Sequence, residues 1–414
     1  MVTLCSRCDL ETTARNCTVQ NGAPCRACEV DVLRPPRGAL QHENCPKTRA
    51  MRNTRYDPFI LKLPPEIASH IFILLMGDRD NGDVCQRRNG LPTPFLLGAV
   101  CSGWRKLARS TPALWSRLAF TFSDSMLIKN KINTPHLIAD WLGRSGALPL
   151  NLQFSYDGEG YNGYVYPSDR RNRWLSVMDT LRMYSEWWYE AGFTLPAHYI
   201  AALHGTAPPN NLRTLTFSNI KDWKLDNIFL DFKMTTDPSP TNFKMDGFCL
   251  KYVHISWDKL VHLELDRTPV DNVLRVKQDA PLLETCLLFR ISSFNGDFPT
   301  TTGTTICHPQ IRTLAVSPWD VDVFTELLNS LELPCLESCE LRSHSEDKVV
   351  MLVDTVVLFV KRSACVLKTL NLRCNLVNYS DDEPSLGIED VEELFRAVPH
   401  LQHRLSAHEV SCYQ

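Results

Sequence analysis

The chain has 414 residues, which is long enough for two or three domains. Hydrophobic residues make up 44% of it and charged residues 22%, as in an ordinary soluble globular protein. The formal charge is −3, from 44 Lys and Arg against 47 Asp and Glu, so charge favours neither nucleic acid nor an anionic membrane as the main partner. The first ten residues lack the apolar run of a signal peptide, so we expect a cytoplasmic or nuclear protein. The 16 cysteines are then expected to be reduced thiols.

Residues 1–55 form a cysteine-rich segment of separate character. Cys5 and Cys8 make one Cys-x-x-Cys pair, Cys25 and Cys28 make a second, and 16 residues separate the two pairs. This spacing fits a four-cysteine zinc site, in which the thiolates surround one ion as a tetrahedron. However, neither pair carries the glycine that eases the tight turn, and few apolar residues lie between them. Two interpretations stay open: a zinc-binding segment, and a disordered tail without metal.

The stretch from Phe59 to Leu118 carries three short helical patterns, each beginning at proline. Proline suits the first turn of a helix because its missing N–H would have no partner there. In the first two patterns, apolar residues recur at helical spacing: Ile67, Ile71, Leu74 and Leu75, then Leu97, Val100, Cys101, Trp104, Leu107 and Ala108. This apolar surface is larger than a segment of about 60 residues can bury alone. We expect either the rest of the chain or a partner to cover it.

The order of LPPEI, Ile71-Phe72, VCSGWRKLA and STPALWSRL resembles the F-box, the motif that docks a protein onto the Skp adaptor of SCF-type ubiquitin ligases. With its trailing STPALW element, the stretch is similar to the F-box-like proteins of mushroom-forming fungi. The resemblance covers about one seventh of the chain, and we assign residues 56–120 to a small three-helix F-box. The insert at 77–92 is longer and more polar than we expect in that motif. The resemblance implies that these residues contact the adaptor: Leu63, Pro64, Pro65, Ile67, Ile71, Phe72, Val100, Cys101, Trp104 and Trp115.

Residues 121–414 contain a recurring strand pattern. A helical pattern from Thr134, followed by the alternating strand pattern PLNLQFSY, gives the first helix–turn–strand unit. Cores of the L-x-x-L-x-L type then begin at Leu212, Leu260, Leu282, Ile311, Cys335 and Leu367, at intervals of 48, 22, 29, 24 and 32 residues. These intervals surround the range of leucine-rich repeats, and the interval of 48 residues has room for an irregular double unit. No unit can bury its leucines alone, so stacked neighbours are expected to form the core.

We therefore predict an α+β or α/β solenoid, in which the F-box is followed by an irregular leucine-rich-repeat-like array at 121–414. The alternative is an ordinary α/β domain with leucine-rich strands. Helical patterns at Val321–Leu331, Val349–Val360 and 388–398 alternate with the strand cores. Another helical pattern places Trp174, Met178, Leu181 and Tyr184 on one face, with Trp187 and Trp188 adjacent. We expect these residues to pack in the core, and any exposed aromatic among them to suit peptide binding.

The sequence carries no P-loop, nucleophile elbow or His-Glu-x-x-His motif, so we expect no enzyme. The resemblance implies a substrate-recognition subunit of an SCF-type E3 ubiquitin ligase. Its F-box would hold the Skp adaptor and, through it, a cullin scaffold, and its repeat domain would hold an unidentified target protein. No tight cluster of arginines in the sequence indicates a phosphate pocket.

Two other functions stay open. One is a binding module that uses zinc and the basic residues of 1–55 to contact nucleic acid or protein. The other is an enzyme that binds a nucleotide at the glycine-rich, tyrosine-rich loop of 158–163. That loop has the G-x-G-x-x-G spacing, but Tyr and Pro residues follow it in place of a helix start that could hold a pyrophosphate. Neither function explains the pattern between Leu63 and Trp115.

Overall fold

The structure is a computed structural model, and it describes residues 59, 62–76, 93–123, 134–157, 168–209, 211–219, 230–292, 305–318, 321–343 and 349–374. The chain divides into two compact units. The first comprises Met1–Ile71 and Leu97–Ala108, and the second comprises Phe72–Leu96 and Arg109–Gln414. Several predicted features lie outside the described residues, namely the two cysteine pairs, the insert at 77–92, the loop at 158–163 and the helix at 388–398.

In the described part of the chain, three α-helices precede the sheet in sequence: α5 (Pro65–Leu75), α6 (Thr93–Val100) and α7 (Ser102–Arg109). The first two begin beside prolines, as predicted. The second predicted helical pattern, with apolar residues from Leu97 to Ala108, is divided at Cys101 into α6 and α7. Cys101 caps the start of α7: its carbonyl accepts the Arg105 N–H at 3.0 Å and its Sγ accepts the Trp104 N–H at 3.4 Å. The third predicted helix is only one 3-10 turn, η1 (Pro112–Leu114), because the chain then becomes a strand.

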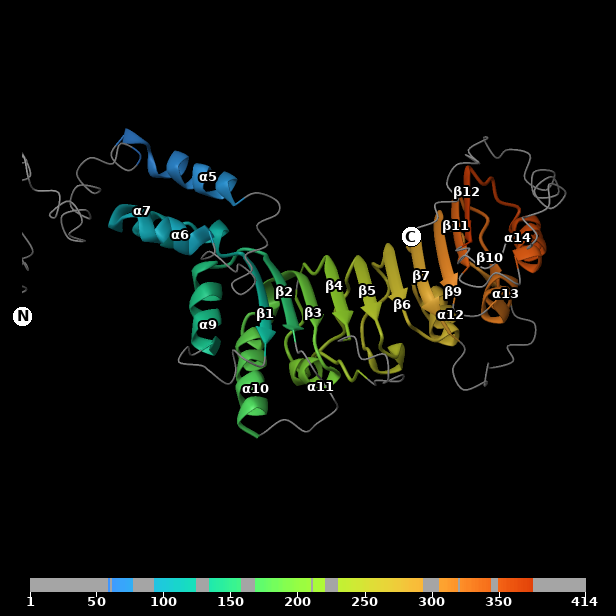
Figure 1. Cartoon of the computed structure of the whole chain (residues 1–414), viewed down its shortest axis with the longest axis horizontal. Helices are drawn as coiled ribbons and strands as arrows, with labels where there is room; N and C mark the ends of the chain where they lie inside the picture. Colours follow the sequence, from blue (N-terminus) through green and yellow to red (C-terminus); the bar gives the residue numbers. More distant parts are fainter. Residues whose placement is uncertain are drawn as a thin grey trace, which may run out of the picture. The chain divides into compact units, whose positions relative to one another are not determined.

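The second unit contains a sheet of ten parallel strands that is not closed. The strands lie in chain order (Figure 1): β1 (Arg117–Ser123), β2 (Leu150–Asp157), β3 (Trp188–Thr194), β4 (Thr214–Ser218), β5 (Asn242–Asp246), β6 (His262–Asp266), β7 (Thr285–Ile291), β9 (Thr313–Pro318), β11 (Ser338–Ser343) and β12 (Thr369–Cys374). The prediction of an α/β fold is therefore confirmed.

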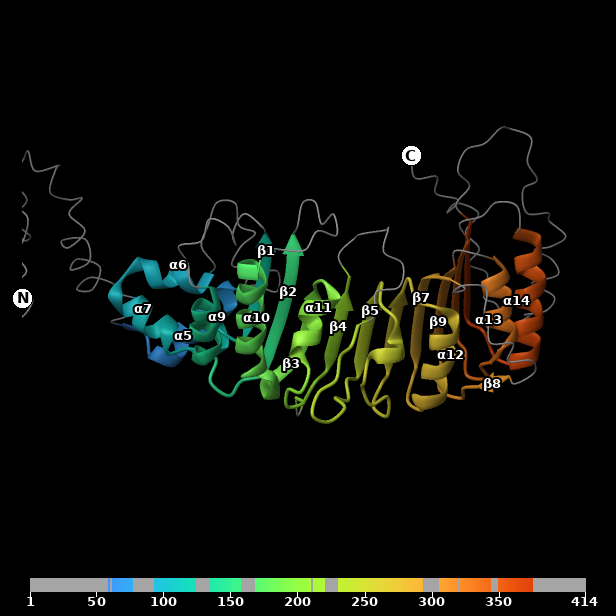
Figure 2. The ribbon, with the colours of Figure 1, turned by 90° about the horizontal axis from the view of Figure 1, so that it is seen from below.

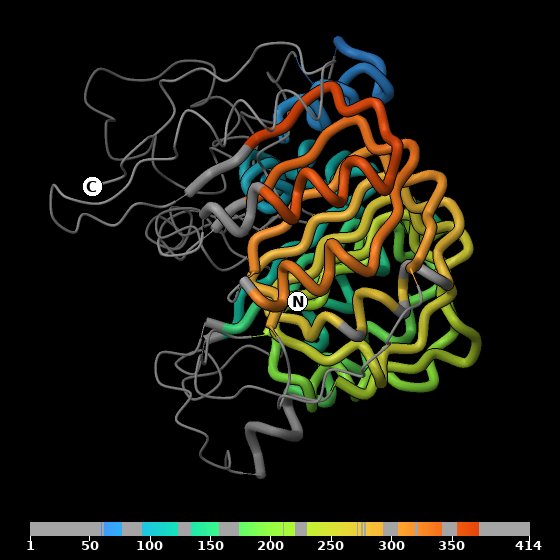
Figure 3. Tube along the Cα trace, turned by 90° about the vertical axis from the view of Figure 1, so that its right-hand side faces the viewer, coloured from blue at the N-terminus to red at the C-terminus, as the bar shows by residue number. Residues whose placement is uncertain are grey.

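Helices or short turns connect the successive strands. Parallel neighbours need crossover connections, and right-handed crossovers between strands in chain order fall on one side of a sheet. Figure 2 shows α10, α11 and α12 on the same side, and Figure 3 looks along the row of strands, with successive turns one behind another. The connecting helices are α9 (Thr134–Arg144), α10 (Ser168–Arg182), α11 (Ala197–Ile200), α12 (Val270–Asp279), α13 (Val321–Asn329) and α14 (Val349–Ser363). The shorter elements are η2 (Ser185–Trp187), η3 (Ala201–Leu203), η4 (Leu250–Tyr252), β8 (Ile306–Cys307) and β10 (Leu331–Glu332), and β8 pairs with β10.

All six predicted strand cores overlap strands of this sheet, which are β4, β6, β7, β9, β11 and β12. In β4, β5 and β6 every second side chain is buried, as the two-residue period of a strand requires. Three strands of the ten-stranded sheet were not predicted: β1, β3 and β5. The last of these occupies the interval of 48 residues where the sequence left room for a double unit.

Phenylalanine rings stack across the first four strands of the sheet. Phe120, Phe154, Phe193 and Phe217 are in register on β1 to β4, and successive ring centroids lie 6.3, 6.3 and 6.1 Å apart. Trp174 of α10 packs nearby, with its ring centroid 4.0 Å from that of Phe122 and 4.6 Å from that of Tyr199.

The helical pattern that begins at Trp174 is core, as predicted. Trp174, Met178 and Leu181 are buried on α10, and Trp188 is buried on β3. Tyr184 and Trp187, which follow α10, are only half-buried.

The apolar run from Val349 was predicted to be a buried helix. It forms most of α14, and Val356, Phe359 and Val360 are buried while Asp354 and Leu358 are exposed. No helix in the described part of the chain has both the length and the apolar character needed to cross a membrane.

The phenylalanine stack predicts a large effect of Phe193→Ala on stability. The substitution removes a fully buried ring between two stacked neighbours, so it should lower the free energy of unfolding by about 3–5 kcal/mol. Urea unfolding followed by tryptophan fluorescence measures this. The control is Thr216→Ala on β4, whose side chain is on the opposite face of the sheet from the phenylalanine stack. It should change the free energy of unfolding by less than about 0.5 kcal/mol. Equal losses in the two variants would contradict the role of the stack.

Candidate functional site

The residues that the F-box resemblance assigns to adaptor docking differ in exposure. Pro64, Pro65, Ile67 and Val100 are exposed; Leu63, Ile71 and Trp104 are half-buried; and Phe72, Cys101 and Trp115 are buried. In this structure the three buried side chains have packing roles. The indole of Trp115, for example, lies edge-on to Trp141 at 4.9 Å between ring centroids, and the Arg144 guanidinium lies 4.4 Å from its ring. The surface that a partner can reach therefore consists mainly of the exposed members and, in part, of the half-buried ones.

Helix α5 carries an exposed apolar stripe. Its buried side consists of Ala68, Phe72 and Met76 at four-residue spacing. Away from that side, Ile67 is 51% exposed and Leu74 is 67% exposed, and these two residues are seven positions apart on one face. The exposed side of a helix in a globular protein normally carries polar residues, so an apolar stripe there is typical of a surface that a partner covers.

A second candidate surface is the polar face of the sheet, which consists of the strand residues that alternate with the buried ones. Its character changes along the row of strands. The face is mainly hydroxyl and amide on β1 to β4 and charged on β5 and β6, and β7 adds the apolar side chains of Leu287 and Phe289. The half-buried charged members on β5 and β6 are Lys244, Asp246, His262, Glu264 and Asp266.

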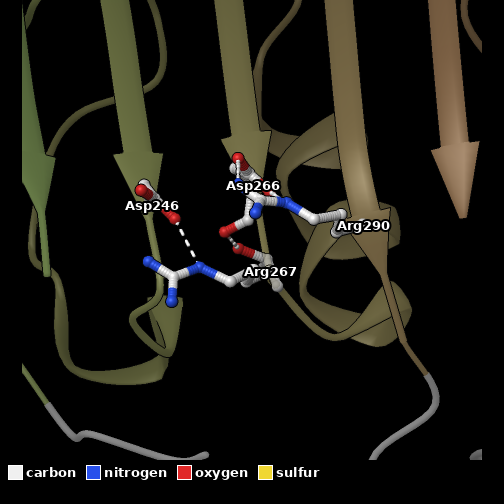
Figure 4. Close-up of polar contacts among 5 residues, drawn as sticks. Asp246, Asp266, Arg267 and Arg290 are labelled. Carbon is white, nitrogen blue, oxygen red and sulfur yellow. Dashed lines mark hydrogen bonds and ion pairs between the residues drawn. The ribbon is translucent and has the colours of Figure 1, made fainter. Parts of the chain in front are cut away.

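Ion pairs join successive turns where β5, β6 and β7 end (Figure 4). Arg267 follows β6, and its Nε donates to Oδ1 of Asp246, the last residue of β5, at 2.7 Å. Arg290 of β7 donates through Nε at 2.7 Å, and also through Nη2, to the two carboxylate oxygens of Asp266. These hydrogen bonds raise the pKa of the Arg290 guanidinium above its ordinary value. Each aspartate thus binds an arginine from the next turn.

Both arginines have an uncommon backbone conformation. Gly247 and Arg267 are at equivalent positions, since their N–H groups donate at 3.0 Å to the carbonyls of Asp266 and Phe289 on the next strand. The φ angle is 75° at Gly247, 53° at Arg267 and 48° at Arg290. A residue other than glycine pays about 1–2 kcal/mol in this left-handed region.

Gly247 also makes room for the neighbouring arginine. A Cβ atom at position 247 would lie 2.9 Å from Nη2 of Arg267 and 3.1 Å from its Cζ. The guanidinium of Arg267 therefore lies directly against the Gly247 backbone. It is positioned from two sides, by this contact and by its hydrogen bond to Asp246.

A further charged group lies on the polar face of β5 and β6. Lys244 Nζ is 2.7 Å from Oε2 of Glu264, and His262 Nε2 is 3.9 Å from the same oxygen. Partial burial, and then the charge of Lys244, lower the pKa of His262, although Glu264 acts in the opposite direction. The folded protein thus favours the neutral imidazole.

Buried groups that resemble catalytic residues have structural roles. His308 is buried, with Nε2 2.9 Å from the Ala280 carbonyl oxygen and Nδ1 3.4 Å from the Gln310 N–H nitrogen that donates to it. Burial raises the pKa of the Cys339 thiol to about 12, so this thiol stays protonated. Among the residues that the structure describes, no three His, Cys, Asp or Glu side chains gather as a metal site. The zinc candidates Cys5, Cys8, Cys25 and Cys28 lie outside that part of the chain.

The Asp–Arg pairs were not predicted from the sequence. The sequence has no tight cluster of arginines, and 23 positions separate Arg267 from Arg290 along the chain. The available signal was a strand pattern ending in aspartate in two successive turns, KMD at Asp246 and ELD at Asp266.

Comparison with known proteins adds no family to these observations. A search of protein-family models and a search of the curated proteins both returned no match to this chain. The functional argument therefore depends on the residues and geometry described above.

Two glycine substitutions separate backbone strain from the clash with Arg267. Gly205 has φ 74°, and nothing lies within 4 Å of the position that a Cβ atom would take, so Gly205→Ala should cost about 1 kcal/mol of unfolding free energy from strain alone. Gly247→Ala has nearly the same φ, but its Cβ must also displace the Arg267 guanidinium and would lie 3.1 Å from the Asn219 Cβ, so its cost should be larger. Urea unfolding of both variants measures the difference, and equal costs would show that Arg267 does not rest on Gly247.

The lowered pKa of His262 predicts a pH effect on stability. Below the ordinary pKa of 6.5 the unfolded chain binds a proton at this site more readily than the folded chain does. The stability of the parent should therefore fall, relative to His262→Gln, as the pH drops from about 7.5 to about 5.5. Urea unfolding of both proteins at the two pH values measures this difference. Parallel pH dependence of the two proteins would contradict the prediction.

Proposed function

We propose that this chain is the substrate-recognition subunit of an SCF-type E3 ubiquitin ligase. In this proposal an F-box at 56–120 docks the Skp adaptor, and a leucine-rich-repeat-like array at 121–414 binds a target protein. The observation that carries the proposal is the exposed apolar stripe of α5, because this helix begins within the LPPEI element of the F-box-like pattern.

The exposed apolar side chains give the docking helix its binding free energy. Burial of a large aliphatic side chain contributes about 1.5–3 kcal/mol, so two or three such residues together contribute several kcal/mol toward docking. On α5 these are Ile67, Leu74 and Leu75, the last of which is 58% exposed. On α6, Leu96 and Val100 are also exposed, at 43% and 45%.

The chain order of the parallel strands supports the repeat-like interpretation of the second unit. A leucine-rich repeat contributes one strand per turn, with buried leucines at equivalent positions. Here one buried aliphatic residue precedes each of six strands at an equivalent position, in the set Leu212, Leu260, Leu283, Ile311, Leu336 and Leu367. Proline stands two residues before three of them, at Pro281, Pro309 and Pro334.

The proposal assigns no chemical step to the chain itself. The adaptor would connect the chain to a cullin scaffold, and the polar face of the sheet would hold the target. A ubiquitin-conjugating enzyme on the same scaffold would then meet the lysines of the target at a high effective concentration.

Co-purification of the full chain with a fungal Skp adaptor tests the proposal. The parent chain should bind, and Ile67→Asp/Leu74→Asp should not, because burying two carboxylates in an apolar contact costs several kcal/mol. Both substitutions are at exposed positions, so the helical circular dichroism should not change. The matched control is Leu358→Asp on α14, where the leucine is 58% exposed, and it should bind as the parent does.

Two outcomes would refute the proposal. One is a folded parent chain that does not bind the adaptor. The other is adaptor binding that survives Ile67→Asp/Leu74→Asp, since the stripe of α5 would then have no part in it.

A further inference from the structure

Arg267 has hydrogen-bonding capacity that its contacts in the described part of the chain do not use. A guanidinium has five N–H donors, one on Nε and two on each Nη. The only hydrogen bond from the Arg267 side chain to a described residue is from Nε to Asp246, at 2.7 Å. Its Nη1 and Nη2 groups are directed neither to a carboxylate nor to a carbonyl there, and the side chain is 22% exposed. Among the described residues these Nη donors therefore have no acceptor.

The position of Arg267 is fixed by its neighbours. Arg267 directly follows β6, at the carboxyl ends of the parallel strands. Asp246 and the backbone of Gly247 fix the guanidinium before any ligand arrives. A group that is already fixed loses little side-chain entropy on binding, which raises affinity.

The neighbouring charges do not prevent an anion from binding. Both carboxylate oxygens of Asp266 are taken by Arg290, in the two-point geometry that is strongest for this pair. Asp246 is paired with Arg267 itself, and Glu264 with Lys244 at 2.7 Å. Each of these carboxylates is thus matched by a cation. Nη1 and Nη2 of Arg267 remain as donors.

An apolar area on the same polar face adjoins the charged strands. In register across β6, β7 and β9, Glu264 is followed by Leu287 and then by Ala315. Leu287 is half-buried on a face that is otherwise polar. A segment that crosses these strands would therefore meet an apolar contact at β7 and an arginine at the end of β6.

We propose that Arg267 determines the specificity of the target site by binding an oxyanion on a side chain of the target protein. Nη1 and Nη2 would donate to the two oxygens of a carboxylate or to two oxygens of a phosphoryl group. The target segment would also carry an aliphatic side chain for Leu287. The part of this inference that makes the ligand a target protein rests on the proposed function.

Peptide pools test the inference on the full chain. Four fluorescent pools have the same randomised flanks with one fixed leucine, and their central residue is Glu, phosphoserine, Gln or Ser. The parent chain should retain the Glu pool, the phosphoserine pool or both at least about tenfold better than the Gln and Ser pools. A preference for the Glu pool alone identifies a carboxylate as the group recognised, and a preference for the phosphoserine pool alone identifies a phosphoryl group.

The test variant is Arg267→Gly, because glycine adopts φ 53° without strain and the variant should fold as the parent does. It should lose the preference for charged pools. The matched control is Arg312→Ala, which removes the same charge at the amino end of β9, where Arg312 pairs with Glu337 at 3.0 Å. It should keep the preference.

Equal retention of all four pools by the parent would overturn the inference. A preference that survives Arg267→Gly, or one that is lost equally in Arg312→Ala, would also overturn it. Adaptor co-purification from the same preparations reports separately on the proposed function. A chain that prefers anionic peptides but does not bind the adaptor would refute the ubiquitin-ligase role and leave the anion site standing.

Discussion

The parallel ladder from β1 to β12 is the constraint on which the second unit depends. Adjacent strands pair in a continuous parallel register, with two irregularities, at Leu150/Asn151 and at Phe289/Ile291. Because side chains alternate along a strand, this register places equivalent residues of successive turns side by side. The phenylalanine stack and the row of buried leucines follow directly. A slip of one residue in any strand would exchange its apolar and polar faces, so burial itself maintains the register.

The same register organises the polar side of the sheet. Strands that start and stop together bring their last residues to one edge, where an aspartate of one turn meets an arginine of the next. Arg267 and Arg290 occupy left-handed backbone positions that glycine would adopt more easily. Partly exposed ion pairs contribute only about 0–1 kcal/mol, which offsets at most part of that strain. The arginines are therefore not explained by stability alone, which is consistent with a role in binding.

Sequence patterns predicted the elements whose periodicity was undisturbed. The α/β class, the six leucine-type cores and the helices from Val321 and Val349 all followed from spacing alone. The strands β1 and β3 were not predicted because each follows a helical pattern directly, with no break in the sequence of apolar residues to mark where the strand begins. The strand β5 was not predicted because its sequence, NFKMD, has no leucine at the start of the strand pattern. Helical spacing also showed that Ile67 and Leu74 share a face of α5, but it could not show that this face is exposed. The pairing of Arg267 with Asp246 depends on turn lengths that set which strand ends meet, and no local pattern contains that information.

Strands in chain order have a consequence for how such a chain changes during evolution. Each internal strand pairs only with the one before it and the one after it, so the gain or loss of one turn alters two junctions and leaves the others intact. The segments between strands differ widely in length while the ladder continues across them. Duplication and deletion of turns can thus lengthen, shorten or recombine the polar face. Single substitutions can change the side chains that one turn contributes to this face without altering the other turns. Helix α5 is not one of these turns, so new recognition surfaces can arise while its sequence stays unchanged.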